Sequence, residues 1–279
     1  LFGESPRGMW PAEGGVSATA LSLMAEQSVE WAATGQTVLV NSLLKSHLNV
    51  ADKNEYLYQP YRVTNGEHDI LCFFRDDNLS DKIGFEYAKM HTPDAVADFV
   101  KTLEDIHQSV AVDATNSQSK VVSVILDGEN AWEYYPYNGY YFLSELYEAL
   151  ANHPDIEMTT FSDMVDLYQS KQYKTKRISA PALPQVAAGS WVYGTFSTWI
   201  GSKDKNLAWD LLCTAKKTYD SVLSKSALNA DQLVACERQL AICEGSDWFW
   251  WFGDYNSSDS VASFDQLYRL NLINLYKLL

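Results

Sequence analysis

The sequence predicts an α/β domain built on a parallel sheet or barrel, followed by a mainly helical region. Through the first two thirds, strand-like and helix-like stretches alternate, which is typical of a parallel sheet. A basic, proline-containing stretch (KQYKTKRISAPALP, residues 171–184) then suggests a linker. Beyond it the pattern is helical, at about 203–223, 229–242 and 258–278. We therefore expect two domains, at residues 1–175 and 176–279.

Within the first domain, local signals mark most of the elements. Residues 16–26 are rich in helix formers, with Ser17 as an N-cap, and residues 68–74 form a short buried strand. Thr92 and Pro93 begin a helix that runs to about residue 110. The elements expected next are a strand at 120–126 (KVVSVIL), a helix at 139–152, a strand at 156–160 and a helix at 161–169.

Composition limits the classes of partner. The net charge of -15 and the pI near 4.6 argue against nucleic acid and anionic membranes, which attract Lys and Arg. No apolar run approaches the roughly 20 residues that span a bilayer. The 9 Trp and 17 Tyr suit either stacking on sugar rings or an indole-rich core.

Metal, redox and nucleotide chemistry have no motif here. The four cysteines form no CxxC pair, and their spacing allows at most a Cys236–Cys243 bridge. The five histidines show no HxH or HExxH spacing, and GxSxG, P-loop and GxGxxG motifs do not occur. We expect no metal and no cofactor.

Two acidic residues are the catalytic candidates. Asp127 follows the expected strand at 120–126, at the strand end where parallel α/β folds gather their functional residues. Its alternative role is to cap the next turn, and Glu129 is a rival carboxylate. Glu13 lies in a loop rich in glycine and proline, beside Trp10, and its alternative is an ordinary exposed loop position.

Aromatic clusters supply the candidate binding residues. Asp247 precedes and Trp248 begins a run of five large aromatics (WFWWF, residues 248–252), which either face a ligand or fill a core corner. Trp191 lies in a second cluster (GSWVYGTFSTWIG), and Arg75, after the strand at 68–74, is expected to orient a carboxylate by a two-pronged salt bridge. Two acids among many aromatics favour glycoside chemistry, in which one acid donates a proton and the other attacks or activates water.

Five segments, in order, resemble glycoside hydrolase family 57: GMWPAEGG, FRDDNLSDKIGFEY, VILDGENAWEYYPYNGYYFLSELYEAL, GSWVYGTFSTWIGSKDKNLAWDLL and EGSDWFWWFGDYNSSDSVASFDQLYRLNLINLY. The resemblance covers about residues 2–278. It implies an incomplete (β/α)7 barrel followed by a C-terminal helical bundle. It also implies an α-amylase, amylopullulanase, 4-α-glucanotransferase or branching activity.

The resemblance also implies roles for single residues. Glu13 corresponds to the family's nucleophile and Asp127 to its acid/base, with carboxyl groups about 5–5.5 Å apart if the mechanism is retaining. Trp10 would lie at the floor of the sugar site, and Asp247 and Trp248 would line the cleft. The family's N-terminal His-containing motif is missing, so the expected partners are an α-glucan and the missing N-terminal part of the same protein. Residues 35–36 are Gly-Gln where relatives often carry an acidic pair.

Three classes of function remain open. The first is a retaining α-glucan hydrolase, or a 4-α-glucanotransferase that uses the same residues. The second is a non-catalytic glycan-binding or assembly protein, which has no need of both Glu13 and Asp127. The third is a deacetylase on a similar barrel, which would need an Asp and paired histidines that this sequence lacks.

Overall fold

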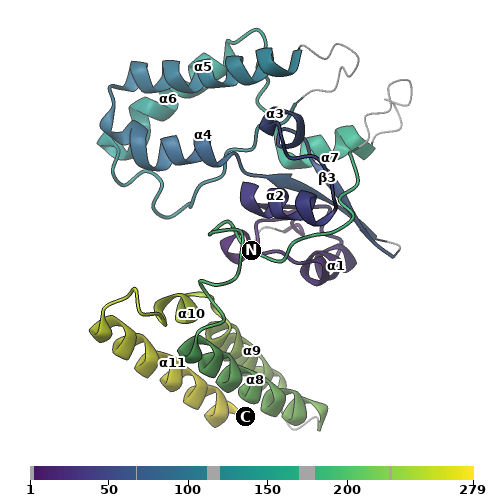
Figure 1. The fold of residues 1–279 in the computed structure, drawn as a ribbon. Coiled ribbons are helices and arrows are strands. Elements are labelled where there is room, and N and C mark those ends of the chain that lie inside the picture. The colour runs from purple at the N-terminus through teal and green to yellow at the C-terminus, as the bar shows by residue number, and fades with distance from the viewer. Residues whose placement is uncertain (1–2, 67, 112–119, 170–179, 226–227) are drawn as a thin grey trace. The chain divides into compact units, whose positions relative to one another are not determined.

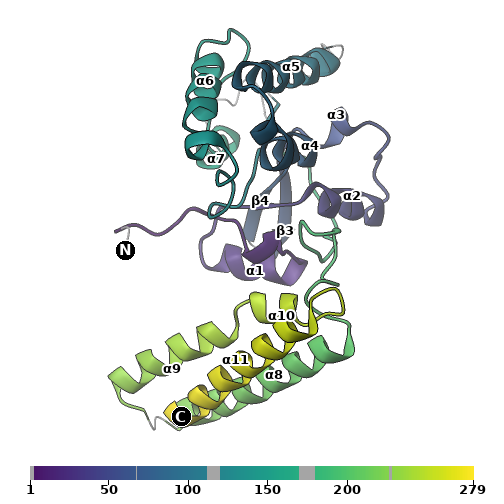
Figure 2. The same cartoon turned by 90° about the vertical axis from the view of Figure 1, so that its left-hand side faces the viewer.

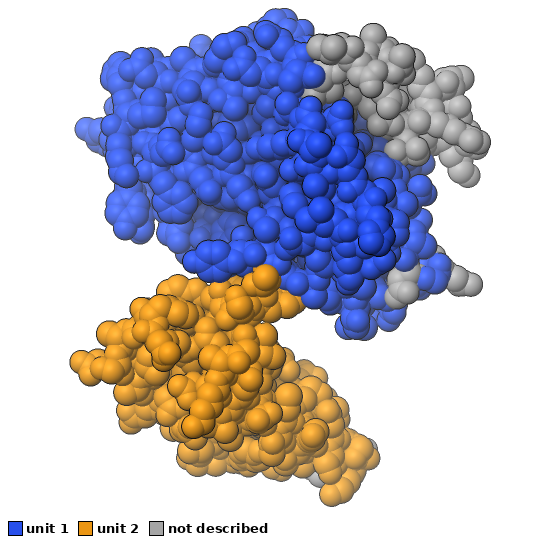
Figure 3. Space-filling model, viewed as in Figure 1, with its two compact units in different colours: residues 1–194 blue, residues 195–279 orange. Residues whose placement is uncertain are grey.

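The structure, a computed structural model, describes residues 3–66, 68–111, 120–169, 180–225 and 228–279. It divides into two compact units, Leu1–Gly194 (unit 1) and Thr195–Leu279 (unit 2), coloured separately in Figure 3. Within the described residues, no helix combines the length and apolarity needed to cross a bilayer.

Unit 1 contains a four-stranded sheet with the order β1-β2-β4-β3. Strands β1, β2 and β4 are parallel. Strand β3, which comes just before β4 in the chain, pairs with it in the antiparallel direction (Figure 2). The strand bounds are Gly8–Met9 for β1, Trp31–Thr34 for β2, Tyr61–Asn65 for β3 and His68–Phe74 for β4. The strand predicted at 68–74 is therefore confirmed.

Strand β4 is central because both of its faces are covered. Ile70, Cys72 and Phe74 lie in a large core cluster, whereas Leu71 and Phe73 lie in a smaller one. This alternation follows from the period of two in a strand. Helices surround the sheet, and α5 runs beside α6 (Figures 1 and 2). The helix bounds in unit 1 are Ala18–Glu26 (α1), Gln36–Lys45 (α2), Lys53–Tyr56 (α3), Asp77–Asp81 (α4), Thr92–Ala111 (α5), Tyr140–Ala151 (α6) and Phe161–Gln169 (α7).

The helices predicted in unit 1 are confirmed, with ends that differ by two residues at most. At the start of α1, the Ser17 hydroxyl accepts a hydrogen bond from the backbone N–H of Ala20 at 3.1 Å, as expected of an N-cap.

The strands predicted at 120–126 and 156–160 are wrong. Both edges of β4 are already occupied, by β2 and β3, so the first segment meets the sheet only at a single bridge between Arg75 and Ser123. Its other backbone groups bond to irregular partners, such as the Ser80 hydroxyl that accepts from Ile125 N. In the second segment, the Thr160 hydroxyl accepts from the backbone N–H of Asp163 at the start of α7.

The boundary between the units lies later in the chain than the predicted division at residue 175. Of the predicted linker, residues 171–179 lie outside the described part. The segment that follows packs on unit 1: Arg62 N donates to Pro181 O, and Leu183 N donates to Arg62 O, at 2.8 and 2.9 Å. Val16 and Gly189 also form a bridge. These bonds tie the segment to the sheet, and the division follows only at Gly194.

Unit 2 is helical in its described part. Its helices are α8 (Lys203–Ser224), α9 (Ala230–Cys243), α10 (Asp247–Trp251) and α11 (Ser258–Leu278), and α11 contacts the other three. The three longer helices were predicted. Phe249 and Tyr268 are fully buried at its centre, and Trp209 stacks on Phe249 at 3.9 Å. All four cysteines are free thiols, so the Cys236–Cys243 bridge does not form.

Candidate active site

The Glu13 carboxylate is presented by a strained turn that follows β1. Residues Ala12–Gly14 form one 3-10 turn in which Glu13 has φ 56 and ψ 24, a left-handed conformation. Such a conformation costs a non-glycine residue about 1–3 kcal/mol and is concentrated at functional sites. Gly14 follows at φ +60, and a Cβ there would lie 2.7 Å from the Trp10 ring. The Thr34 hydroxyl, at the end of β2, donates to Gly14 O and fixes the turn.

Trp191 holds Glu13 through both backbone and side chain. Its indole Nε1 donates to Glu13 Oε2 at 3.1 Å, and its backbone N–H donates to Glu13 O at 3.2 Å. The paired backbone bonds between Val16 and Gly189, at 2.8 and 3.0 Å, place the two segments side by side. Gly35 permits this arrangement, because a Cβ there would lie 2.6 Å from Trp191 Cα. Gly35 is where relatives were expected to carry an acidic residue.

Two indoles stand beside the Glu13 carboxylate. The Trp10 and Trp191 rings contact each other edge to face, with centroids 5.2 Å apart and planes inclined at 75°. Both side chains are half-buried. The sequence predicted each of them as a sugar-binding residue, but it gave no indication that the Trp191 N–H is bound to Glu13.

Arg75 connects the end of β4 to the segment that carries Asp127. The buried guanidinium donates from Nε to Ile125 O at 2.8 Å, and its carbon lies 5.2 Å from the centre of the Trp191 ring. Its Nη1 and Nη2 pair with Asp77 and Asp81 at 2.9 and 2.6 Å. The expected two-pronged bridge to one carboxylate is therefore wrong, because the cation is divided between two.

Asp127 lines a cavity of about 680 Å³ within unit 1. The carboxyl is half-buried, and Asn130 Nδ2 lies 3.5 Å from its Oδ2. Burial, and next the negative charge of Glu129, raise the pKa of Asp127. A raised pKa keeps the carboxyl protonated at higher pH, as a general acid requires. The walls of the cavity include Arg75, Phe85, Lys89, Tyr134 and Trp191.

One chain of contacts joins the two candidate carboxylates. Glu13 accepts a hydrogen bond from Trp191, which lies under Arg75, and both Arg75 and Trp191 line the cavity of Asp127. The expected separation of 5–5.5 Å between the two carboxyl groups stays a prediction. In the described residues, no cluster of three or more His, Cys, Asp or Glu side chains is placed to hold a metal ion.

A family model described as "Glycosyl hydrolase family 57" matches residues 1–181, well over half of the chain. The chain belongs to glycosyl hydrolase family 57. The match ends ten positions before Trp191, so it includes both candidate acids but not the indole donor. No curated protein matches the sequence.

Three solved structures are similar in fold to this family 57 chain. They are the α-amylase AmyC from Thermotoga maritima (15% identity, TM-score 0.69), a GH57-type branching enzyme from Pyrococcus horikoshii (15%, 0.65) and the GH57 branching enzyme TK1436 from Thermococcus kodakaraensis (13%, 0.67). They cover 98%, 91% and 94% of this chain. The chain spans only 60%, 49% and 53% of their own lengths.

The remaining predicted residues, Asp247 and Trp248, belong to unit 2. Asp247 is exposed in the first turn of α10. The Trp248 Nε1 donates to Ile242 O at 2.7 Å, and its ring contacts Phe264 and Tyr268. Within unit 2 these aromatics form a packed corner, which the sequence had left open as an alternative. That Asp247 and Trp248 line a substrate cleft stays a prediction.

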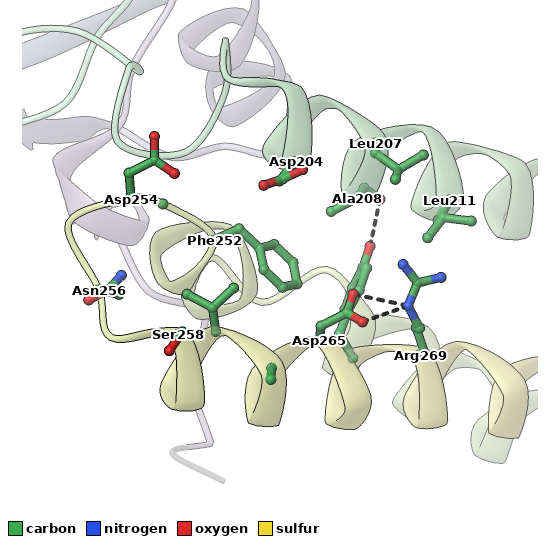
Figure 4. A pocket seen from close by; sticks show the side chains of 14 residues that line it. Asp204, Leu207, Ala208, Leu211, Phe252, Asp254, Asn256, Ser258, Asp265 and Arg269 are labelled. Atoms are coloured by element: carbon green, nitrogen blue, oxygen red, sulfur yellow. Dashed lines mark hydrogen bonds and ion pairs between the residues drawn. The ribbon is translucent and has the colours of Figure 1, made fainter.

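A second cavity, of about 610 Å³, lies entirely within unit 2 (Figure 4). Phe252 and Leu207 are among its apolar walls, and Asp204 and Asp254 are among its acidic residues. Two other polar groups already have partners: Arg269 pairs with Asp265 at 2.8 Å, and the Tyr268 hydroxyl donates to Ala208 O at 2.9 Å. None of the predicted site residues lines this cavity.

Sequence reasoning missed several walls of the Asp127 cavity. Phe85 and Lys89 come from the turns after α4; Phe85 lies in the segment FRDDNLSDKIGFEY that carries the family resemblance, but no local pattern assigns either residue to a site. Tyr134 had a usable signal, because it begins a stretch of aromatics with few apolar neighbours (YYPYNGYY).

Proposed function

We propose that this chain carries both catalytic carboxylates of a retaining enzyme that acts on α-glucans, with Glu13 as nucleophile and Asp127 as general acid/base. Family membership supports this class of reaction. The observation that carries the assignment is that Trp191 both lines the cavity of Asp127 and donates its N–H to Glu13. Burial and the charge of Glu129 raise the pKa of Asp127, which favours Asp127 as the proton donor of the pair.

In the first step, Asp127 donates its proton to the glycosidic oxygen while Glu13 attacks the anomeric carbon. The bond between that carbon and the leaving oxygen breaks, the shortened glucan leaves with the proton, and a covalent ester forms on Glu13. Trp191 holds Oε2, and Oε1 accepts no hydrogen bond from the described residues. We assign Oε1 as the attacking oxygen.

In the second step, the ionised Asp127 removes a proton from the acceptor, whose oxygen attacks the same carbon and releases Glu13. A water acceptor gives hydrolysis, and the hydroxyl of a second glucan gives transfer. Both outcomes use the same residues, so an α-amylase-like hydrolase and a 4-α-glucanotransferase are two results of one mechanism.

Substrate binding in this proposal uses aromatic faces and polar edges. Trp10 and Trp191 stack on sugar rings beside Glu13, and Arg75 contacts hydroxyl groups at the cavity wall. In this proposal the α/β part belongs to an incomplete (β/α)7 barrel.

The test compares Glu13→Gln and Asp127→Asn in the full-length protein on two donors, maltooligosaccharides and α-maltosyl fluoride. Fluoride leaves without protonation, so Asp127→Asn keeps a rapid first release of fluoride but loses turnover of maltooligosaccharides. Glu13→Gln loses both reactions, because no ester can form.

Glu55→Gln is the matched control, since Glu55 is exposed on α3 and does not line the cavity. It should keep both activities, and all three variants should unfold near the wild-type midpoint. Substantial turnover of maltooligosaccharides by either catalytic variant would overturn the assignment.

A further inference from the structure

Next to the Asp127 cavity, four tyrosine side chains point into solvent. Tyr134, Tyr137, Tyr140 and Tyr141 are 78%, 78%, 65% and 51% exposed, and together we term them the tyrosine platform. Tyr141 contacts both Tyr137 and Tyr140 edge to face, with ring centroids 5.3 Å apart in each pair. Contiguous exposed apolar surface of this kind marks interaction sites in soluble proteins.

The backbone under the platform is strained and firmly anchored. Tyr137, Asn138 and Gly139 have φ values of 53, 52 and 80, three left-handed residues in succession. Tyr135 anchors the turn from inside, because its buried hydroxyl donates to Ile83 O at 2.6 Å. Gly139 is fitted against Trp132, where a Cβ would come within 3.0 Å of the indole. The turn therefore holds its tyrosines outward at a conformational cost.

One residue of the platform lies at the cavity. Tyr134 lines the cavity of Asp127, and Tyr137 follows only three residues later, a reach of at most about 11 Å along the chain. The stretch YYPYNGYY carries no charged residue. Phenol rings present apolar faces and hydroxyl edges, which match the alternating CH and OH groups of a neutral sugar chain.

We infer that the tyrosine platform binds the part of a long α-glucan that extends out of the Asp127 cavity, and that it sets a preference for long chains over short ones. This inference rests on the proposed function. A short donor fills only the cavity, so its turnover does not depend on the platform. A long chain also covers the exposed rings.

The test is the double variant Tyr140→Ala/Tyr141→Ala in the full-length protein, assayed on soluble amylose and on α-maltosyl fluoride. Both positions begin α6, and alanine favours helix, so the fold is retained. Loss of two ring contacts should lower kcat/KM on amylose by roughly 5- to 150-fold and leave the rate on α-maltosyl fluoride within twofold. Retardation in native gels containing amylose should fall in parallel.

Tyr147→Ala is the matched control, because this tyrosine is 57% exposed on the same helix but lies outside the platform. It should behave like the wild type. The inference would be overturned if the double variant kept the wild-type kcat/KM and gel retardation on amylose. It would also be overturned if the variant lost activity equally on amylose and on α-maltosyl fluoride. The inference would also be overturned if the wild type forms an oligomer that the double variant does not form, while kcat/KM on amylose stays unchanged. That result would assign the platform to contact with a second copy of the chain. Failure of the proposed function itself has a different signature: the wild type would not turn over α-maltosyl fluoride.

Discussion

Replacing Trp191 with phenylalanine would test one hydrogen bond at Glu13, the proposed nucleophile. The substitution removes the Nε1–H that donates to Glu13 Oε2 at 3.1 Å. It keeps an aromatic ring against Trp10 and beneath the Arg75 guanidinium, and it keeps the backbone bond from residue 191 to Glu13 O. The substitution also makes the ring smaller, a change that the matched control below shares.

The charge on Glu13 determines which step slows. In the first step the carboxylate loses its charge as the ester forms, whereas in the second it regains that charge as the ester breaks. An N–H donor at Oε2 stabilises the developing carboxylate, so its removal slows the second step. A hydrogen bond to a charged group contributes about 1.5–3 kcal/mol, which corresponds to a rate loss of roughly 10- to 150-fold.

The assay follows fluoride release from α-maltosyl fluoride before and during steady state. Trp191→Phe should show a burst of fluoride followed by a slow phase, and the glycosyl-enzyme should be visible as an added maltosyl mass. Trp31→Phe is the matched control, because it removes an indole bond of the same 3.1 Å length, to the Ser162 hydroxyl, away from the cavity. A slow phase without accumulated ester, or equal kinetics in both variants, would refute the reasoning.

Two further predictions concern the turn at the nucleophile and the acid. Gly14→Ala should lower kcat much more than Gly66→Ala does. Both glycines have φ near +60, but only at position 14 would the new Cβ meet an indole, at 2.7 Å. Comparing kcat of the two variants therefore separates steric displacement of the turn from backbone strain alone. Glu129→Gln should move the basic limb of the kcat/KM profile to lower pH. The Glu129 charge raises the pKa of Asp127, and removing it lets this acid ionise earlier as the pH rises; an unmoved limb would contradict the assignment of Asp127 as the acid.

The sequence was sufficient where the signal was local. Ser17 at the start of α1 and the seven apolar-rich residues of β4 place those elements, because a cap and a buried run act within one turn or one strand. Residues 120–126 are as rich in apolar residues as β4, yet they form no strand. What excludes them is strand β3 on the edge of β4, a competitor that lies about sixty positions earlier in the chain and that no local pattern reveals.

The candidate site likewise combines residues with a local sequence signal and a contact that only the fold creates. Glu13 and Asp127 could be named as candidates because each has a local signal, a glycine-rich loop beside an indole and an acid after an apolar run. The bond from Trp191 to Glu13 could not be predicted, since it joins positions 178 residues apart and depends on a glycine at a third place, Gly35. Composition indicates that an indole is available, but only the fold determines which atom it binds.

Arg75 shows why a site residue is better assigned by its occupied donors than by its charge. The guanidinium has five N–H groups, and three of its bonds go to Ile125 O, Asp77 and Asp81. One of these partners lies two positions before Asp127, so the cation fixes the backbone that presents the acid, while its face covers the indole that holds Glu13. Arg75 can still reach a sugar hydroxyl from the cavity wall. Its larger contribution is to connect the segment that carries Asp127 with the indole that donates to Glu13, so that one buried cation contacts the supports of both candidate carboxylates.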